Sequence, residues 1–84
     1  MYYLYILKSQ KDLGYYIGIT RNIEKRLKEH NQGKTKSTKG RLPLILAYFE
    51  KYENKSKARV RELKLKNNYQ IRKKLLNKMN FDIK

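Results

Sequence analysis

The pattern of hydrophobic and polar positions at the start of the chain predicts a β-hairpin. Residues 2–7 and 15–19 form two short runs rich in aromatic and β-branched side chains, which favour strands. Between them, residues 9–14 are mostly polar and end on a glycine, as expected of a turn. We therefore expect two adjacent antiparallel strands.

A pairing of Ile6 with Ile17 in this hairpin would separate aliphatic from aromatic side chains. Side chains alternate along a strand, so each face of the hairpin collects every second residue. One face would carry Leu4, Ile6, Ile17 and Ile19. The other would carry Tyr3, Tyr5, Tyr16 and Gly18. The missing side chain at Gly18 leaves an opening beside two phenols, where a bulky group can approach the backbone.

A basic amphipathic helix is predicted to follow the second strand. Asn22 is its expected N-cap, because an asparagine side chain can accept hydrogen bonds from the amides of the first turn. Ile23 and Leu27 lie four residues apart on the core-facing stripe. Arg26 and His30, also four apart, share a neighbouring stripe. Because the helix begins almost directly after the strand, a guanidinium, an imidazole and two phenols could converge.

Residues 34–41 are predicted to form a mobile polar loop, after the helix stops at residues 31–33. The loop carries four cations, Lys34, Lys36, Lys39 and Arg41. One interpretation is a phosphate clamp that becomes ordered when substrate binds. The alternative is a solvated linker, and the residue pattern favours neither.

Residues 42–49 are predicted to form a third strand, with Pro43 near its start, where a missing amide does least harm. Both faces of the run are apolar, which suits the middle strand of a small antiparallel sheet covered by helices. The expected core residues are Leu44, Leu46 and Tyr48, or the alternate set. A polar turn follows, in which Asn54 or Ser56 would cap the next helix.

Glu62 is expected beside the buried stripe of a second helix, predicted over residues 57–66. Nearly every other charge in this segment is positive. One explanation for the carboxylate is a salt bridge to Arg59 or Lys66, worth roughly a few tenths of a kcal/mol. The other is a metal ligand, since one carboxylate together with waters and substrate oxygens can hold Mg²⁺.

The rest of the chain is predicted to form a third helix over residues 69–78, after an interruption at Asn67 and Asn68. Residues 80–84 are expected to be a frayed tail. Together, these patterns predict a single α+β domain over residues 1–84, in which a small three-stranded antiparallel β-sheet is flanked by about three α-helices.

The net charge favours an anionic partner. The chain has 22 Lys and Arg residues against 7 Asp and Glu, a formal net charge of +15. Nucleic acid is the leading candidate, because each phosphate neutralised releases counterions and adds affinity that falls with salt. The alternative is that the charge reflects a solubilising surface or a lysine-rich genome composition. An anionic membrane surface fits less well, because the cations are spread along the chain and not gathered on one amphipathic helix.

Cysteine content and hydropathy favour an intracellular protein. The absence of cysteine excludes disulfides and Cys-ligated zinc, and it is consistent with a reducing, cytoplasmic compartment. No apolar run approaches the roughly 20 residues of a membrane span, and the first residues lack the charged start of a signal peptide. We therefore expect a soluble cytoplasmic protein with no membrane partner.

The residue types present favour phosphate chemistry. The chain has one histidine, no Walker loop and no Cys/His spacing for zinc. Hydrolysis of a phosphodiester needs a group that positions or deprotonates water, a cation that neutralises developing charge and usually a metal. Tyr5 or Tyr16, Arg26 and Glu62 could fill these roles. Singly, each has a simpler explanation, since tyrosines commonly pack in strands and cations on a helix are commonly solvated.

Four motifs together resemble the GIY-YIG nuclease family. They are Tyr3-Leu4-Tyr5, Tyr16-Ile17-Gly18, Lys25-Arg26-Leu27-Lys28-Glu29-His30 and Arg61-Glu62-Leu63. The chain is most similar to the small bacterial members that consist of this domain alone, with their Tyr-Ile-Leu-Lys opening, Lys-Glu-His-Asn helix end and Tyr-Phe-Glu third strand. The first motif has Tyr-Leu-Tyr in place of Gly-Ile-Tyr.

The resemblance implies a DNA endonuclease that uses one divalent metal, Mg²⁺ or Mn²⁺. Tyr5 matches the tyrosine that acts as general base or positions water, and Tyr16 matches the one that orients water or phosphate. Arg26 matches the phosphate-stabilising arginine. His30 matches a histidine that assists in some members, and Glu62 matches the metal-binding glutamate.

A tyrosine base raises a difficulty, because an unperturbed phenol has a pKa of about 10. The guanidinium of Arg26 and a bound metal nearby would favour the phenolate. If Tyr5 is not the base, a metal-activated water or His30 takes that role.

Six residues are expected to contact the substrate: Tyr3, Gly18, Lys34, Lys36, Lys39 and Arg41. A small domain offers little surface for long sequence readout, so we expect branched, damaged or single-stranded DNA, in DNA repair or recombination. The alternative is a non-catalytic nucleic-acid-binding protein with a vestigial phosphate site, on DNA or structured RNA. A third hypothesis, a basic protein-interaction module, predicts no salt-dependent affinity for nucleic acid.

Overall fold

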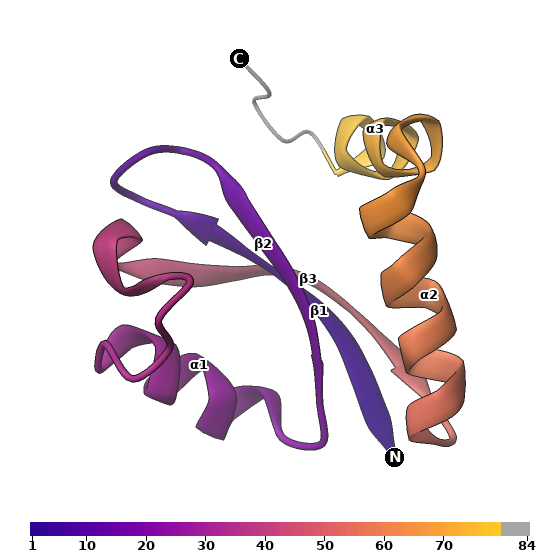
Figure 1. Cartoon of the computed structure of the whole chain (residues 1–84), viewed down its shortest axis with the longest axis horizontal. Helices are drawn as coiled ribbons and strands as arrows, with labels where there is room; N and C mark the ends of the chain where they lie inside the picture. Colours follow the sequence, from indigo (N-terminus) through magenta and orange to yellow (C-terminus); the bar gives the residue numbers. More distant parts are fainter. Residues whose placement is uncertain (80–84) are drawn as a thin grey trace.

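The computed structural model describes residues 1–79 and shows an α+β fold of three antiparallel strands and three α-helices (Figure 1). In chain order the elements are β1 (Tyr2–Ser9), β2 (Tyr15–Thr20), α1 (Ile23–Asn31), the short 3₁₀-helix η1 (Lys39–Arg41), β3 (Leu44–Tyr52), α2 (Lys55–Asn67) and α3 (Tyr69–Lys78). The predicted fold class is confirmed. The tail predicted at residues 80–84 lies outside the described residues. None of the helices within residues 1–79 is long and apolar enough to pass through a membrane.

β1 is the central strand of the sheet, with β2 on one side and β3 on the other. The register of β1 and β2 pairs Ile6 with Ile17 and Tyr5 with Gly18, as the separation of aliphatic and aromatic residues predicted. Helices cover both faces of the sheet: α1 lies on one side, and α2 and α3 lie on the other (Figure 1). The hairpin register therefore decides which residues reach which layer.

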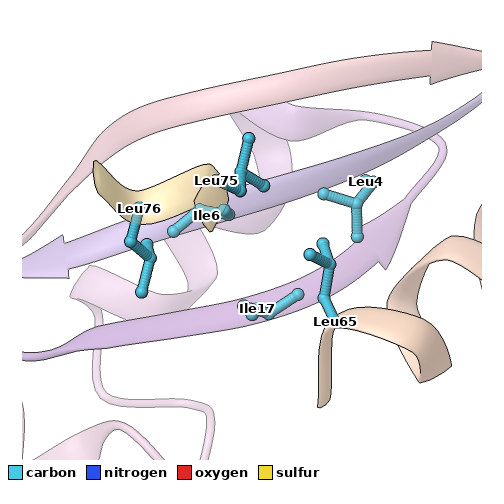
Figure 2. Close-up of a cluster of buried hydrophobic side chains, with 6 residues drawn as sticks. All are labelled: Leu4, Ile6, Ile17, Leu65, Leu75 and Leu76. Carbon is cyan, nitrogen blue, oxygen red and sulfur yellow. The ribbon is translucent and has the colours of Figure 1, made fainter. Parts of the chain in front are cut away.

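The larger core lies between the sheet and the layer of α2 and α3. Figure 2 shows six of its buried side chains: Leu4, Ile6 and Ile17 from the sheet, Leu65 from α2, and Leu75 and Leu76 from α3. Burying an aliphatic side chain of this size contributes about 1.5–3 kcal/mol. This core anchors α2, which carries Glu62, against the sheet.

The smaller core lies under α1. Tyr5, Leu7 and Leu44 are buried there, and Ile23 and Leu27 of α1 pack against them. Ile23 and Leu27 thus form the core-facing stripe of α1, as their spacing predicted. Because Tyr5 ends in a hydroxyl, this layer combines packing with polar chemistry.

Three asparagines determine where the helices begin. Asn22, Asn54 and Asn68 are the N-caps of α1, α2 and α3, and each side chain accepts a hydrogen bond from the amide three residues later. The prediction for Asn22 is confirmed, and of the two caps predicted for α2 the structure has Asn54. The break predicted after α2 is also present, because Asn68 starts a new helix.

The prediction that the third strand lies in the middle of the sheet is wrong. The strand predicted over residues 42–49 is β3, an edge strand that begins and ends later. Leu44 is buried and Tyr48 is half-buried, but Leu46 and Phe49 are 37% and 52% exposed. The apolar run over residues 42–49 had suggested that helices cover both faces of this strand. However, α1 provides only about 13 Å of helix against about 30 Å of strand in β3, so part of that face is uncovered.

Glu50 of β3 ties the edge strand to α2. Its carboxylate accepts hydrogen bonds from the phenols of Tyr48 and Tyr52 at 2.5 and 2.6 Å, and from Nε and Nη2 of Arg61 at 3.0 and 3.1 Å. Burial alone would raise the pKa of Glu50, but these donors, Arg61 first, lower it below its usual value. Arg61 directly precedes Glu62 on α2. Its contact with Glu50 therefore helps to fix the rotational orientation of α2, and with it the direction of the Glu62 side chain.

Replacing Glu50 with glutamine should lower the free energy of unfolding by about 1–3 kcal/mol at neutral pH, since charge-assisted hydrogen bonds are lost. The pKa of Glu50 is lowered in the folded state, so its contribution is present above the unfolded-state pKa and disappears as the pH falls through the folded-state pKa. Urea unfolding of both proteins, from pH 7 into the acid range, should show the difference shrinking.

The matched control is Glu53→Gln, since the Glu53 carboxylate is 76% exposed and should add little stability at any pH. A loss in Glu50→Gln that does not change with pH would contradict the ionic contribution assigned to Glu50.

Candidate active site

A cavity of about 750 Å³ lies where β1, β2, α1 and α2 meet. Residues predicted for the site from distant parts of the sequence line it together: Tyr5, Tyr16, Gly18, Arg26 and Glu62. The two tyrosines and the glycine come from the hairpin, the arginine from α1 and the glutamate from α2. The spatial convergence expected from the sequence is therefore present for these residues.

Gly18 makes room for the phenol of Tyr5. The two residues are paired across the hairpin, and a Cβ at position 18 would lie 2.6 Å from Oη of Tyr5. The Tyr16 ring lies nearby, with its centroid 6.3 Å from that of Tyr5. The opening predicted at Gly18 is thus occupied by the Tyr5 ring, and a side chain at position 18 would displace the hydroxyl.

Tyr5 is a buried, neutral phenol at pH 7. The residue is 2% exposed, and burial raises the pKa of Tyr5 to about 12. The Arg26 guanidinium acts in the opposite direction, as expected, but burial outweighs it. In this state, Tyr5 can donate one hydrogen bond and accept others, which suits the positioning of water.

His30 lies behind Tyr5 and does not line the cavity. It is fully buried, with Nε2 at 3.1 Å from Oη of Tyr5 and Nδ1 at 2.7 Å from Oγ1 of Thr38. Burial and then the charge of Arg26 lower the pKa of His30, so the imidazole is neutral at pH 7. The structure therefore places His30 against the predicted catalytic tyrosine and outside the lining of the cavity.

Arg26 faces the cavity from α1 and is held by Glu29, whose Oε1 accepts from Nη1 at 3.2 Å. Burial alone would lower the pKa of Arg26, but its interactions with Tyr5 and Glu29 raise it. The guanidinium is thus a permanent positive charge that is open to an anion in the cavity.

Glu62 lines the cavity, and the residue is only 4% exposed. Nη1 of Arg59 donates to Oε1 at 2.6 Å, and Nζ of Lys66 donates to Oε2 at 3.0 Å. Both salt bridges considered from the sequence are therefore formed. A buried carboxylate without a cationic partner would be strongly destabilising, so these ion pairs stabilise the charge.

The donor set fits a metal held by a single carboxylate. Within residues 1–79, no group of three or more His, Cys, Asp or Glu side chains could hold a metal ion. Mg²⁺ is commonly held by one or two carboxylates together with waters and substrate phosphates, and Glu62 supplies oxygen donors of that kind. Since Arg59 and Lys66 contact both oxygens, a metal would have to compete with them.

Four cations beside the cavity were not predicted as substrate contacts: Arg21, Lys25, Lys55 and Arg59. All four are exposed. A signal for two of them was present in the sequence, because Lys55 and Arg59 are four residues apart and Arg59 is three before Glu62. These spacings place all three on one face of a helix.

The loop cations that were predicted to bind substrate do not line this cavity. Of these, Lys34, Lys36 and Lys39 are exposed on the segment after α1. Arg41 donates to Oδ2 of Asp12 at 2.8 Å and to the carbonyl of Tyr15 at 3.1 Å. It therefore ties the loop to the hairpin.

Tyr3 also lies outside the main cavity. Its ring packs edge to face against Phe49, with centroids 6.0 Å apart, beside a second cavity of about 530 Å³. Arg21 and Asn22 line both cavities, so the two are adjacent.

Several known proteins are similar to this chain in sequence or in fold. The GIY-YIG catalytic domain matches residues 1–79. A UPF0213 protein of Clostridium perfringens is 52% identical over 67 residues, which cover 79% of this chain and 71% of that protein. Another, from Haloquadratum walsbyi, is 36% identical over 83 residues, or 98% and 92% of the two chains. The solution NMR structure of a UPF0213 protein from Bacillus halodurans is similar, with a TM-score of 0.57 and 31% identity over 98% of this chain and 88% of that one. The chain therefore belongs to the GIY-YIG catalytic domain family.

Proposed function

We propose that this protein is a divalent-metal-dependent DNA endonuclease that hydrolyses phosphodiester bonds. The observation that carries the proposal is the single cavity shared by Tyr5, Tyr16, Arg26 and Glu62. Membership of a family whose domain is described as catalytic adds support. The proposed substrates are branched, damaged or single-stranded DNA in repair or recombination, since a small domain has little surface for long sequence readout.

In this proposal the scissile phosphate enters the cavity between Arg26 and Glu62. Arg26 neutralises the charge that develops on the phosphoryl oxygens. Tyr5, held from behind by His30, orients the attacking water, and Tyr16 orients water or phosphate. Glu62 would hold the divalent metal, Mg²⁺ or Mn²⁺, which when bound supplies Lewis-acid chemistry at the phosphate.

The cations beside the cavity are the proposed contacts to the phosphates that flank the cleaved bond. Arg21 directly follows β2, and Lys25 is in the first turn of α1. Lys55 and Arg59 line the same cavity from α2. The loop cations, Lys34, Lys36, Lys39 and Arg41, would contact DNA that extends beyond the cavity.

A non-catalytic nucleic-acid-binding protein is the second candidate. It is favoured by the ion pairs of Glu62, because both carboxylate oxygens are engaged by Arg59 and Lys66 as in a structural salt bridge. With a net charge of +15, both candidates predict an affinity for nucleic acid that falls with salt. Only the endonuclease predicts metal-dependent nicking.

Purified protein should nick branched or single-stranded DNA with Mg²⁺ or Mn²⁺ and be inactive in EDTA. Arg26→Ala should lower the nicking rate by about 10²–10³-fold, the loss typical when one group that stabilises transition-state charge is removed. Its affinity for DNA should change little, because many other cations contribute. Gel-based nicking and binding assays on one panel of labelled DNA forms measure both quantities.

Lys28→Ala is the matched control, since it removes one positive charge from the same helix at a residue that does not line the cavity. DNA binding without cleavage on every substrate, with every divalent metal tried, would reject the endonuclease in favour of the second candidate.

Arg59→Gln should tighten Mn²⁺ binding in the absence of DNA by up to roughly fivefold. The ion pair of this exposed arginine with Glu62 is worth about 0.2–1 kcal/mol and competes with the metal. Glu62→Gln should abolish specific binding. Electron paramagnetic resonance of Mn²⁺ measures the affinity without relying on activity.

Lys57→Gln serves as the control on the same helix, because Lys57 pairs with the exposed Glu53 and should leave Mn²⁺ affinity unchanged. Equal Mn²⁺ binding by wild type and Glu62→Gln would exclude Glu62 as a metal ligand.

A further inference from the structure

Thr38 is a fully buried threonine on a segment whose neighbouring residues are exposed. Its Oγ1 is 2.7 Å from Nδ1 of His30, and Nε2 of His30 is 3.1 Å from Oη of Tyr5. Thr38, His30 and Tyr5 thus form a continuous hydrogen-bonded chain that runs from the loop after α1 to the cavity. All three residues are buried, with Tyr5 at 2% exposed and His30 and Thr38 at 0%.

The direction of these hydrogen bonds decides what Tyr5 presents to the cavity. A neutral imidazole has one N–H donor and one acceptor nitrogen. With the hydrogen on Nδ1, Thr38 accepts from His30, and Nε2 accepts from the Tyr5 hydroxyl. With the hydrogen on Nε2, His30 donates to Tyr5, and the phenolic hydrogen points elsewhere.

Contacts at both ends of the chain favour the hydrogen on Nδ1. At the loop end, the carbonyl of Thr35 lies 3.5 Å from Oγ1 of Thr38. A carbonyl only accepts, so the Thr38 hydroxyl donates to it and keeps a lone pair for Nδ1–H. At the cavity end, Arg26 lines the same cavity as Tyr5, and its positive charge favours negative charge on the phenolic oxygen. A nearby cation attracts the oxygen lone pairs and repels the hydroxyl hydrogen, so the phenolic hydrogen is directed to Nε2 of His30.

We propose that Thr38 is a positioning residue for the reaction: it holds His30 with the hydrogen on Nδ1, so that Tyr5 donates to His30 and directs an oxygen lone pair toward the attacking water. The role of Thr38 in the reaction rests on the proposed endonuclease function. The direction of the hydrogen bond between His30 and Tyr5 is independent of that function, and it can be measured in the protein without DNA or metal.

Nitrogen NMR of ¹⁵N-labelled protein at neutral pH distinguishes the two forms of His30, because protonated and unprotonated ring nitrogens have different chemical shifts. We expect Nδ1 to carry the hydrogen. A hydrogen on Nε2 would overturn the proposal whatever the activity of the protein.

Thr38→Val removes the hydroxyl with little change in shape. We expect the His30 spectrum to show a mixture of the two forms. We expect kcat for nicking to fall by about 10- to 100-fold, at or below the lower end of the roughly 10²–10⁴-fold that positioned acid–base groups contribute, because Thr38 acts only through His30. KM should be unchanged, because Thr38 does not line the cavity. Thr38→Ser keeps the hydroxyl and should restore both the spectrum and kcat.

Ser37→Ala is the matched control, since Ser37 is exposed on the same segment and should change neither measurement. Thermal unfolding of each variant establishes that it is folded. An unchanged kcat in folded Thr38→Val with a mixed His30 spectrum would overturn the positioning role. Absence of nicking by wild type, with the hydrogen on Nδ1, would instead refute the endonuclease proposal, so the two failures are distinguishable.

Discussion

The close approach of Tyr5 to Gly18 is the constraint on which the candidate active site depends. Their pairing places the phenolic oxygen where a Cβ would lie within 2.6 Å, so the ring fits only because position 18 has no side chain. The same register places Ile6 opposite Ile17 and directs both into the core under α2 and α3. A slip of one residue in β1 would send Tyr5 into that core and Ile6 to the opposite face. One register therefore determines both the stability of the sheet and the position of the phenol.

The layer under α1 contains buried polar groups, and the hydroxyls of Tyr5 and Thr38 are matched to the two imidazole nitrogens of His30. Tyr5 contacts His30, and His30 contacts Thr38. A buried polar group that loses its partner costs about 1–3 kcal/mol, so removing one member leaves the next one unsatisfied. The loop after α1 is thereby coupled to the cavity without contributing a residue to its lining. That coupling gives a role to a threonine that is fully buried between two exposed neighbours.

Local patterns explain most of what could be predicted from the sequence. The hairpin register, the Asn22 cap and the position of Glu62 on a buried stripe depend on residues two to four positions apart, where alternation and helical spacing are informative. The order of the strands depends on contacts between distant segments, and the apolar residues of β3 do not reveal which strand they will join. The positions of Lys55 and Arg59 beside the cavity were missed for a similar reason: their spacing places them on the helix face of Glu62, but it does not reveal that this face borders a cavity formed with distant segments. The contact of Thr38 with His30 arises from an irregular loop, which has no period to detect.

The net charge of +15 attracts anions in general, but the local pairing of charges in the cavity decides whether a metal and a phosphate can bind there. Exposed cations spread over the surface attract any polyanion, but solvent and salt screen them beyond about 10 Å. In the cavity, Glu62 is paired with Arg59 and Lys66, so part of the positive charge there is already neutralised. On the proposed function, a divalent cation that binds Glu62 would release Arg59 to contact a phosphate, and a phosphate that attracts Arg59 would leave Glu62 open to the cation. Each binding event then favours the other by the same factor, as linkage requires. A carboxylate paired with two cations is therefore compatible with catalysis, provided that metal and DNA bind together.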